Sequence, residues 1–233
     1  MPYELILLDV DDTLLDFQLA EEQALVRVFL EQNIHIDQLM MDRFRAINQR
    51  LWTQFELGYI ELNTLRTERF MRLLTEFHID GDANRCSEAF LQHLSEEAFM
   101  MEGALELCNY LSDQKYRLGI ITNGIREVQI RRLQKAGIFD RFEEVIVSED
   151  AGFQKPHQGI FDYTLNKLKV SSKEHVLIIG DSITSDIQGG IQYGIHTCWF
   201  NPLGKKNASS FSPNYEIRRL MDVVRILEEY RIS

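Results

Sequence analysis

Short apolar segments alternate with helix-like segments over the second half of this chain, and this alternation constrains the fold more than any other feature. Each apolar run has the length of a short strand buried on both faces. Such alternation predicts an α/β fold, with a doubly wound parallel sheet, a Rossmann-like core and helices on both faces. The predicted strands are 5–8, 116–121, 144–147, 175–179 and 197–200.

The stretch between the first two strands has a different pattern. From residue 19 to residue 99, apolar side chains recur at helical spacing and almost no strand signal is present. We therefore expect an α/β core formed by residues 1–15 and 100–233, and an all-helical cap, residues 16–99, inserted into it. After a polar loop over 204–213, a final amphipathic helix is marked by Ile217, Leu220, Met221, Val224 and Leu227.

Polar side chains follow several predicted strands at the point where each strand ends. Asp9 follows the first strand, Thr122 the second and Asp181 the fourth, while Lys155 lies on the connection after another strand. Ligands of doubly wound sheets bind beyond the carboxyl ends of the strands. We therefore expect these four side chains to form one site.

Three carboxylates, Asp9, Asp11 and Asp12, fall within four residues at the first strand end. Burying an unpaired carboxylate is costly and like charges this close repel each other, so a cation is needed to compensate them. Mg²⁺ prefers oxygen ligands and is usually held by one or two carboxylates together with substrate phosphate. The alternative is a solvated acidic turn, which is common at strand ends.

The composition narrows the choice of partners. A net charge of −11 disfavours binding to nucleic-acid polymers or to an anionic membrane, whereas a local cation still allows a small anionic substrate. Cys86, Cys108 and Cys198 are far apart and form no CxxC pair, as expected for reduced thiols. Because no apolar run suits a signal peptide or a membrane span, we expect a cytoplasmic protein.

Four short motifs occur in order along the chain, and together they resemble those of the haloacid dehalogenase (HAD) superfamily of phosphohydrolases. The resemblance extends over the whole chain and implies a HAD-like core with a helical cap. It also implies hydrolysis of a phosphate ester with Mg²⁺ as the cofactor. The motifs are Asp9-Val10-Asp11-Asp12-Thr13-Leu14, Thr122-Asn123-Gly124, Lys155-Pro156, and Gly180-Asp181-Ser182 with Asp186.

The resemblance gives the first motif its roles. Asp9 is the implied nucleophile, which forms an aspartyl-phosphate and also binds the metal. Asp11 is the implied general acid for the leaving oxygen and then the general base for water, and its backbone carbonyl is a metal ligand. Thr13 is expected to orient Asp11 through a hydrogen bond, and Asp12 is expected to be structural.

The other motifs complete the implied site. Thr122 and Asn123 bind phosphoryl oxygens, and Lys155 neutralises the phosphoryl group and the nucleophile. Asp181 is the second carboxylate on the metal, and Asp186 holds Lys155 or a metal-bound water. The residues alone leave alternatives open, because the second motif could be a helix-capping turn and Lys155 a solvated loop lysine.

Individual residues distinguish this chain from superfamily members that catalyse other reactions. Its dehalogenases lack an acid two residues after the nucleophile, whereas this chain has Asp11. Its phosphonoacetaldehyde hydrolases form a Schiff base with a lysine of the cap, and here no lysine precedes Lys115. Sugar-phosphate phosphatase and phosphomutase activities stay open. A non-catalytic binding scaffold is a further alternative, which would not need Asp9, Asp11, Lys155 and Asp181 all to be intact.

A longer match covers 180–190 and 197–202 and resembles the YjjG/YfnB branch of HAD phosphatases, which is associated with 5′-nucleotidase activity. We therefore expect the substrate to be a small phosphorylated metabolite, a nucleoside monophosphate. In the cap, Trp52, Phe55 and Tyr59 are three and four residues apart and are expected to share a helical face. They either pack in the core of the cap or contact the nucleotide base.

Overall fold

The computed structural model describes residues 3–232, and the chain divides into two compact units. One unit contains the residues up to Phe17 together with those from Ala98 onward, and the other is Gln18–Glu97. Both boundaries lie two residues from those proposed from the sequence. The first unit holds the sheet, and the second holds most of α1 and all of α2, α3 and α4.

The sheet has six strands within the described residues, in the order β3-β2-β1-β4-β5-β6. Every pair of neighbouring strands is parallel. The predicted doubly wound parallel sheet is therefore confirmed. The strands are β1 (Leu5–Leu8), β2 (Arg117–Thr122), β3 (Glu144–Val147), β4 (Val176–Gly180), β5 (His196–Phe200) and β6 (Tyr215–Ile217).

The last strand corrects the sequence prediction near the C-terminus. Ile217, assigned there to the final helix, lies in β6 and pairs with Phe200 of β5. The final helix α10 (Asp222–Ile232) begins five residues later. The apolar spacing of Ile217, Leu220 and Leu227 is compatible with a helix, but all three side chains pack in one core cluster from a strand, a turn and a helix.

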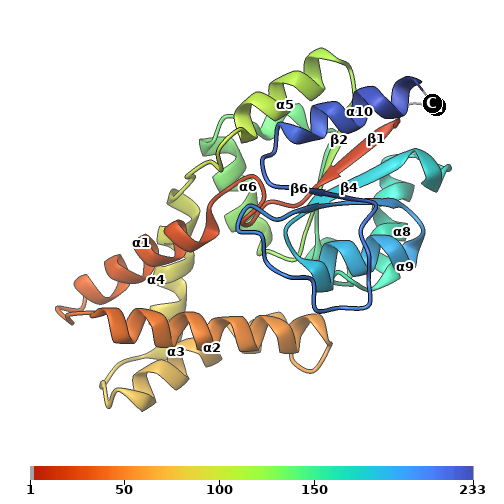
Figure 1. The fold of residues 1–233 in the computed structure, drawn as a ribbon. Helices are drawn as coiled ribbons and strands as arrows, with labels where there is room; N and C mark the ends of the chain where they lie inside the picture. Colours follow the sequence, from red (N-terminus) through yellow and green to blue (C-terminus); the bar gives the residue numbers. More distant parts are fainter. Residues whose placement is uncertain (1–2, 233) are drawn as a thin grey trace. The chain divides into compact units, whose positions relative to one another are not determined.

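Alternate residues of β1 point to opposite faces of the sheet, as the pleat requires. Ile6 and Leu8 pack in a cluster with α5 and α10, whereas Leu5 and Leu7 pack in a second cluster with α8. Figure 1 shows the same layers, with α5 and α10 on one face of the sheet and α8 and α9 on the other. The core helices are α5 (Ala104–Asp113), α6 (Arg126–Lys135), α7 (Ser148–Ala151), α8 (Gln158–Lys167), α9 (Gln188–Tyr193) and α10.

The strand order fixes the place where a ligand binds. From β1 the chain moves outward through β2 to β3, then crosses back to add β4 on the other side of β1. This reversal makes a switch point between β1 and β4, and the crevice beyond their carboxyl ends is the usual ligand site of such a sheet. Asp9 and Asp181 are the first residues after these two strands.

The helical unit has a core of its own. The rings of Phe44, Phe70 and Phe90 pack against one another, with centroids 5.1–5.5 Å apart. The buried guanidinium of Arg69 lies 4.4 Å from the centroid of the Phe90 ring and donates a hydrogen bond to Asn48. The helices are α1 (Phe17–Leu30), α2 (Gln38–Glu56), α3 (Leu62–Glu76) and α4 (Ala83–Glu96).

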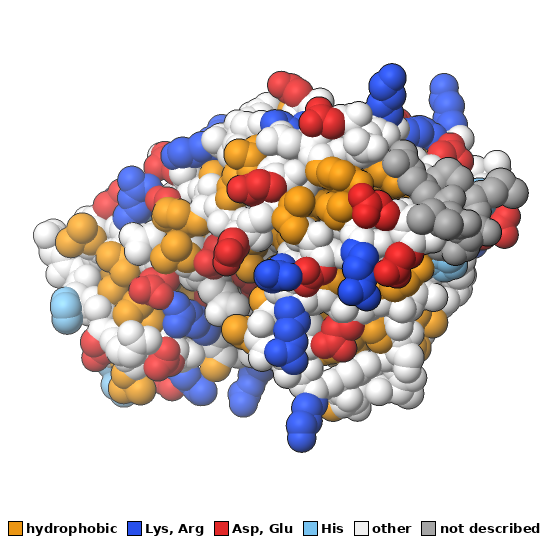
Figure 2. Space-filling model, turned by 45° about the horizontal axis from the view of Figure 1, so that its top comes forward, with side chains coloured by type: hydrophobic (Ala, Val, Ile, Leu, Met, Phe, Trp, Pro, Cys, Tyr) orange, Lys and Arg blue, Asp and Glu red, His pale blue; other side chains and the backbone are white. Residues whose placement is uncertain are grey.

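Among the described residues, no helix combines the length and the apolar character needed to cross a membrane. On the face drawn in Figure 2, acidic and basic side chains are intermixed and apolar patches lie between them. The described residues of this face therefore form no continuous basic surface, which is what a polyanion would need for electrostatic binding.

Candidate active site

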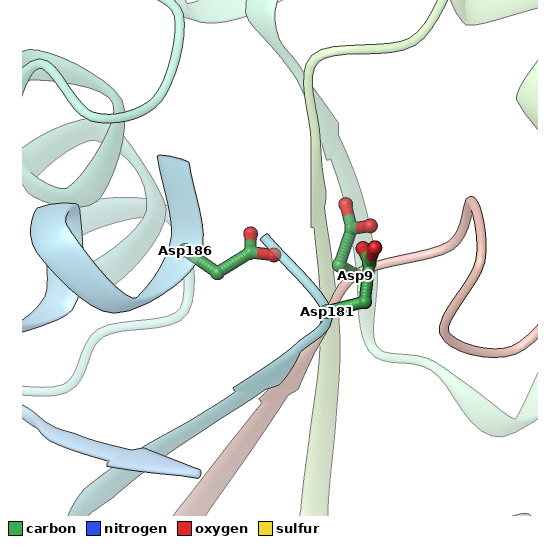
Figure 3. A group of neighbouring side chains, drawn as sticks. All are labelled: Asp9, Asp181 and Asp186. Atoms are coloured by element: carbon green, nitrogen blue, oxygen red, sulfur yellow. The ribbon is translucent and has the colours of Figure 1, made fainter. Parts of the chain in front are cut away.

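Three carboxylates meet at the predicted edge of the sheet. Asp9 follows β1, Asp181 follows β4, and Asp186 lies in a turn of π-helix at Ile183–Ile187. In Figure 3 the Asp9 and Asp181 carboxylates lie side by side, and Asp186 points toward them from the other side. One ligand oxygen of each lies within 4.8 Å of the others. This geometry could hold a metal ion.

Lys155 is the cation of this cluster. Its side chain is almost completely buried, and Nζ donates to Asp9 Oδ1 at 2.6 Å, to Asp186 Oδ1 at 2.6 Å and to the carbonyl oxygen of Ile121 at 2.7 Å. Three acceptors use all three protons of an ammonium group. Lys155 is therefore fixed against the strand ends, which excludes the alternative of a solvated loop lysine.

Asn123 holds the backbone of Lys155 in place. Its side-chain amide donates to the Lys155 carbonyl at 2.9 Å, and its Oδ1 accepts from the Lys155 N–H at 2.7 Å. This reciprocal pair joins the loop after β2 to the loop after α7, and it uses one of the two N–H groups of the amide. The Asn123 side chain thus has a structural task that the sequence did not reveal.

The hydroxyl of Thr122 is oriented by its neighbours. Its oxygen accepts from the backbone N–H of Gly124 at 3.0 Å and lies 3.5 Å from Nε2 of Gln129. A hydroxyl that accepts from two N–H donors still has its own proton to donate. Thr122 is therefore suited to bind an anionic oxygen, as the sequence predicts.

Asp186 is completely buried and accepts hydrogen bonds from two loops. Besides accepting from Lys155, its other oxygen accepts from the backbone N–H of Ser182 at 3.1 Å. Gly180 makes room for it, because a Cβ atom there would lie 2.2 Å from Asp186 Oδ2. Asp186 holds Lys155 in this structure, which is one of the two tasks suggested for it.

Asp181 is half-buried, and its backbone is anchored from the neighbouring strand. The indole Nε1 of Trp199, in β5, donates to the carbonyl oxygen of Asp181 at 2.8 Å. Burial raises the pKa of the Asp181 carboxyl well above its ordinary value, and the charges of Asp186, Asp9 and Asp12 raise it further. Its ionised form therefore needs a further cation nearby.

The ionised form of Asp9 is disfavoured in the same way. Burial raises the pKa of Asp9; the Lys155 ammonium lowers it, and the carboxylates of Asp186 and Asp11 raise it. Burial disfavours the charged form of Lys155 too, but Asp186 and Asp9 outweigh this and raise its pKa. The cluster of Asp9, Asp181 and Asp186 thus contains three carboxylates, and Lys155 pairs with two of them. A divalent cation on Asp9 and Asp181, whose oxygen donors suit Mg²⁺, would complete the balance.

The contacts of Asp11 differ from those expected. Thr13 Oγ1 is buried and has no hydrogen-bond partner among the described residues, so the predicted bond from Thr13 to Asp11 is not formed. Instead, Arg132 Nη1 donates to Asp11 Oδ1 and Gln129 Nε2 donates to Asp11 Oδ2. Asp12 has a structural role, as expected, because its Oδ1 accepts from the Phe17 N–H where α1 begins.

Sequence reasoning missed Gln129 and Arg132. Both lie in α6, three residues apart, and their side chains are buried although the helix is polar overall. A buried arginine needs a partner of opposite charge. The one available sequence signal was the i, i+3 spacing of these two residues on a helix that begins two residues after the second motif.

The three cap aromatics do not share one helical face. Trp52 and Phe55 lie in α2, where their rings make an edge-to-face contact with centroids 5.7 Å apart. Phe55 is buried, whereas Trp52 is half-buried. Tyr59 lies beyond the end of α2 and is 74% exposed, so it is free to take part in a contact outside the cap core.

Comparison with known proteins agrees with this geometry. The family model described as haloacid dehalogenase-like hydrolase matches residues 6–200. The chain belongs to this family, and within it to a group of phosphatases.

Three relatives cover nearly the whole chain. The HAD-hydrolase YfnB of Bacillus subtilis is 41% identical, covering 97% of this chain and 95% of its own. The pyrimidine 5′-nucleotidase PynA of Streptococcus pneumoniae is 34% identical, covering 98% and 97%. The pyrimidine 5′-nucleotidase YjjG of Escherichia coli is 30% identical, covering 97% and 99%. The resemblance to the YjjG/YfnB branch is therefore confirmed.

A solved structure of YfnB extends the likeness to three dimensions. It matches with a TM-score of 0.92 at 40% identity, covering 98% of this chain and 100% of that chain. That crystal structure is described as bound to magnesium and as revealing interdomain movement.

Proposed function

We propose that this chain is a Mg²⁺-dependent phosphomonoesterase that works through an aspartyl-phosphate on Asp9, with nucleoside 5′-monophosphates as substrates. The observation that carries the proposal is the buried Lys155 ammonium, 2.6 Å from both Asp9 and Asp186 at the switch point of the sheet. It places a fixed positive charge beside the nucleophile, where a phosphoryl group acquires charge in the transition state.

In the first step, an oxygen of Asp9 forms a bond to phosphorus as the bond from phosphorus to the ester oxygen breaks. The leaving alkoxide takes a proton from the Asp11 carboxyl. In the second step, Asp11 takes a proton from water, whose oxygen bonds to phosphorus as the acyl-phosphate bond breaks. Asp9 is then restored and inorganic phosphate is released. Splitting the reaction in this way replaces one difficult displacement by two easier ones.

The remaining residues hold the phosphoryl group. The Thr122 hydroxyl and the free N–H of the Asn123 amide donate to its oxygens, and Lys155 balances its charge. Asp9 and Asp181, with the backbone carbonyl of Asp11, would hold Mg²⁺. When bound, the ion offsets negative charge on the phosphoryl oxygens and on the carboxylates.

Mg²⁺ is expected to stabilise the folded protein. At a hundred times its dissociation constant, a ligand adds about 2.7 kcal/mol, which corresponds to about 5–10 °C in the unfolding midpoint of a chain of this size. Thermal melts with and without Mg²⁺, and after adding EDTA, measure the shift. Asp181→Asn should lose most of it, whereas Asp113→Asn at the exposed end of α5 should keep it. An unchanged shift in Asp181→Asn would remove Asp181 from the metal site.

The substrate class rests on PynA and YjjG, both named pyrimidine 5′-nucleotidases. Sugar-phosphate hydrolysis and phosphomutase activity are the alternatives within the family. We expect the highest kcat/KM for a pyrimidine nucleoside 5′-monophosphate, by about tenfold or more over hexose and triose phosphates, because a base contact can add about 1–3 kcal/mol. Phosphate release across such a panel, with hexose-phosphate isomers analysed for mutase products, decides among them.

In the cap, Trp52 and the exposed Tyr59 are our candidates for the base contact, whereas the burial of Phe55 favours a packing role. A non-catalytic scaffold would release no phosphate from any member of the panel, with or without Mg²⁺. Phosphate release that requires Mg²⁺ and follows no nucleotide preference would uphold the phosphomonoesterase and overturn the nucleotidase.

A further inference from the structure

Helix α6 carries two side chains that reach Asp11 from more than a hundred residues away in the sequence. Arg132 Nη1 donates to Asp11 Oδ1, and Gln129 Nε2 donates to Asp11 Oδ2, so both oxygens of the carboxylate are held. We propose that Gln129 and Arg132 are positioning residues for the proton transfers of Asp11. This inference rests on the proposed function, because it assumes that Asp11 is the acid and base of the phosphatase reaction.

Burial makes this contact rigid. Arg132 is 0% exposed and Gln129 is 1% exposed, whereas the Asp11 side chain is 28% exposed. Two buried donors thus hold a carboxylate that is itself partly exposed. Ion pairs between exposed, mobile side chains fix a geometry poorly. An ion pair in which one partner is buried in the core is less mobile, because neighbouring side chains hold the buried partner.

The second motif explains how Gln129 reaches its position. A Cβ atom on Gly124 would lie 2.0 Å from Gln129 Nε2 and 2.7 Å from its Cδ, so only glycine leaves room for this side chain in its present place. Gln129 Nε2 is also 3.5 Å from Thr122 Oγ1. Gln129 therefore lies between the hydroxyl proposed to bind the phosphoryl group and the carboxyl proposed to protonate the leaving group, and it fixes their separation.

These contacts leave Asp11 able to act. Each carboxylate oxygen has two lone-pair positions, so one position remains on the oxygen that accepts from Gln129. A proton can be delivered from there, or taken up there from water. Displacement of a reacting group by about 1 Å can cost on the order of a hundredfold in rate. Loss of either donor should therefore weaken the proton transfer more than the attack of Asp9.

Leaving groups distinguish this role from simple support of the fold. Uridine 5′-monophosphate releases an alkoxide that needs a proton, whereas p-nitrophenyl phosphate releases a phenolate that needs little protonation. For Gln129→Met and Arg132→Met we expect kcat on the nucleotide to fall about 10- to 100-fold. On p-nitrophenyl phosphate it should fall by less than about threefold, with little change in KM. Gly124→Ala should behave like Gln129→Met.

Matched controls exist on the same helix. Gln134→Met and Arg131→Met alter exposed residues of α6 and should change neither substrate's kcat. In an Asp11→Asn background, Gln129→Met and Arg132→Met should cause no further loss on the nucleotide, because the group that they position is gone. If Arg132→Met does not fold, Gln129→Met, which keeps nearly the same shape, carries the test.

Two results would overturn the inference. One is an equal loss on both substrates in Gln129→Met. The other is a loss that simply multiplies with that of Asp11→Asn. Both leave the proposed function standing, provided that Asp11→Asn itself shows the selective loss on the nucleotide. Failure of the wild-type protein to hydrolyse either ester would instead overturn the proposed function.

Discussion

Asp9→Asn is expected to lower phosphate release by about four orders of magnitude or more while the protein stays folded. Removing the nucleophile of an enzyme that forms a covalent intermediate costs on this scale, because the residual rate comes from binding and charge stabilisation alone. An amide is a poor nucleophile and a weak metal ligand. The fold should tolerate the change, since asparagine has nearly the same shape and relieves the repulsion of Asp9 from Asp186 and Asp11.

Two measurements check this expectation. Steady-state phosphate release gives the rate, and mass spectrometry after acid quenching should detect phosphate on the peptide that contains Asp9 in the wild type but not in the variant. Asp113→Asn is the matched control, because it makes the same acid-to-amide change at an exposed site and should keep the wild-type rate. An Asp9→Asn sample free of deamidation by mass that keeps more than about 1% of the wild-type rate would exclude Asp9 as the nucleophile.

Lys155→Met is expected to reduce both catalysis and stability. Its ammonium donates to two buried carboxylates and a carbonyl, so the variant leaves Asp9 and Asp186 without their shared cation. Removing one partner of a buried ion pair costs about 3–5 kcal/mol, or about 10 °C in the unfolding midpoint. Loss of a fixed charge at the reacting group should lower kcat by about a hundredfold to a thousandfold.

Lys167→Met, at the exposed end of α8, is the matched control and should change neither property. Mg²⁺ should restore part of the stability of Lys155→Met, because it supplies positive charge to the same carboxylates, but it should not restore kcat. A stable variant with more than about a tenth of the wild-type kcat would show that Lys155 supports neither the transition state nor the carboxylate cluster.

The sequence revealed much of this site because its main residues end strands. Asp9, Thr122 and Asp181 follow apolar runs that are typical of strands, and parallel strands bring their carboxyl ends to one edge. Lys155 was predictable from its motif. Its three acceptors were not all predictable, because the carbonyl of Ile121 is a backbone group that carries no sequence signal.

The contacts made by α6 could not be predicted from strand ends or motifs. Asp11 is 118 residues from Gln129 and 121 from Arg132, and whether their side chains meet depends on how α6 is rotated about its axis against the sheet. Helical periodicity gives that rotation only when the apolar face is clear. In α6 two of the four buried residues are these polar ones, so the sequence shows no clear apolar face from which the rotation could be predicted.

The edge strand β6 was not predicted from the sequence, for a related reason. This strand has only three residues, Tyr215–Ile217, and its middle side chain, Glu216, is exposed. Its pairing with β5 comes from backbone hydrogen bonds, with Asn201 of the neighbouring loop donating to Glu216 at 2.7 Å. A strand this short carries too few side chains to show an alternating pattern.

The space left by two glycines links positions that could otherwise vary independently during evolution. A methyl group on Gly180 would require the Asp186 side chain to move or be replaced, and one on Gly124 would require the same of Gln129. Each glycine and the side chain that fills its space are therefore expected to evolve as a pair, because a larger residue at the glycine position would clash with that side chain. Lineages that depart from Gln129 are released from the constraint on Gly124, so the two positions should diverge together, in that order.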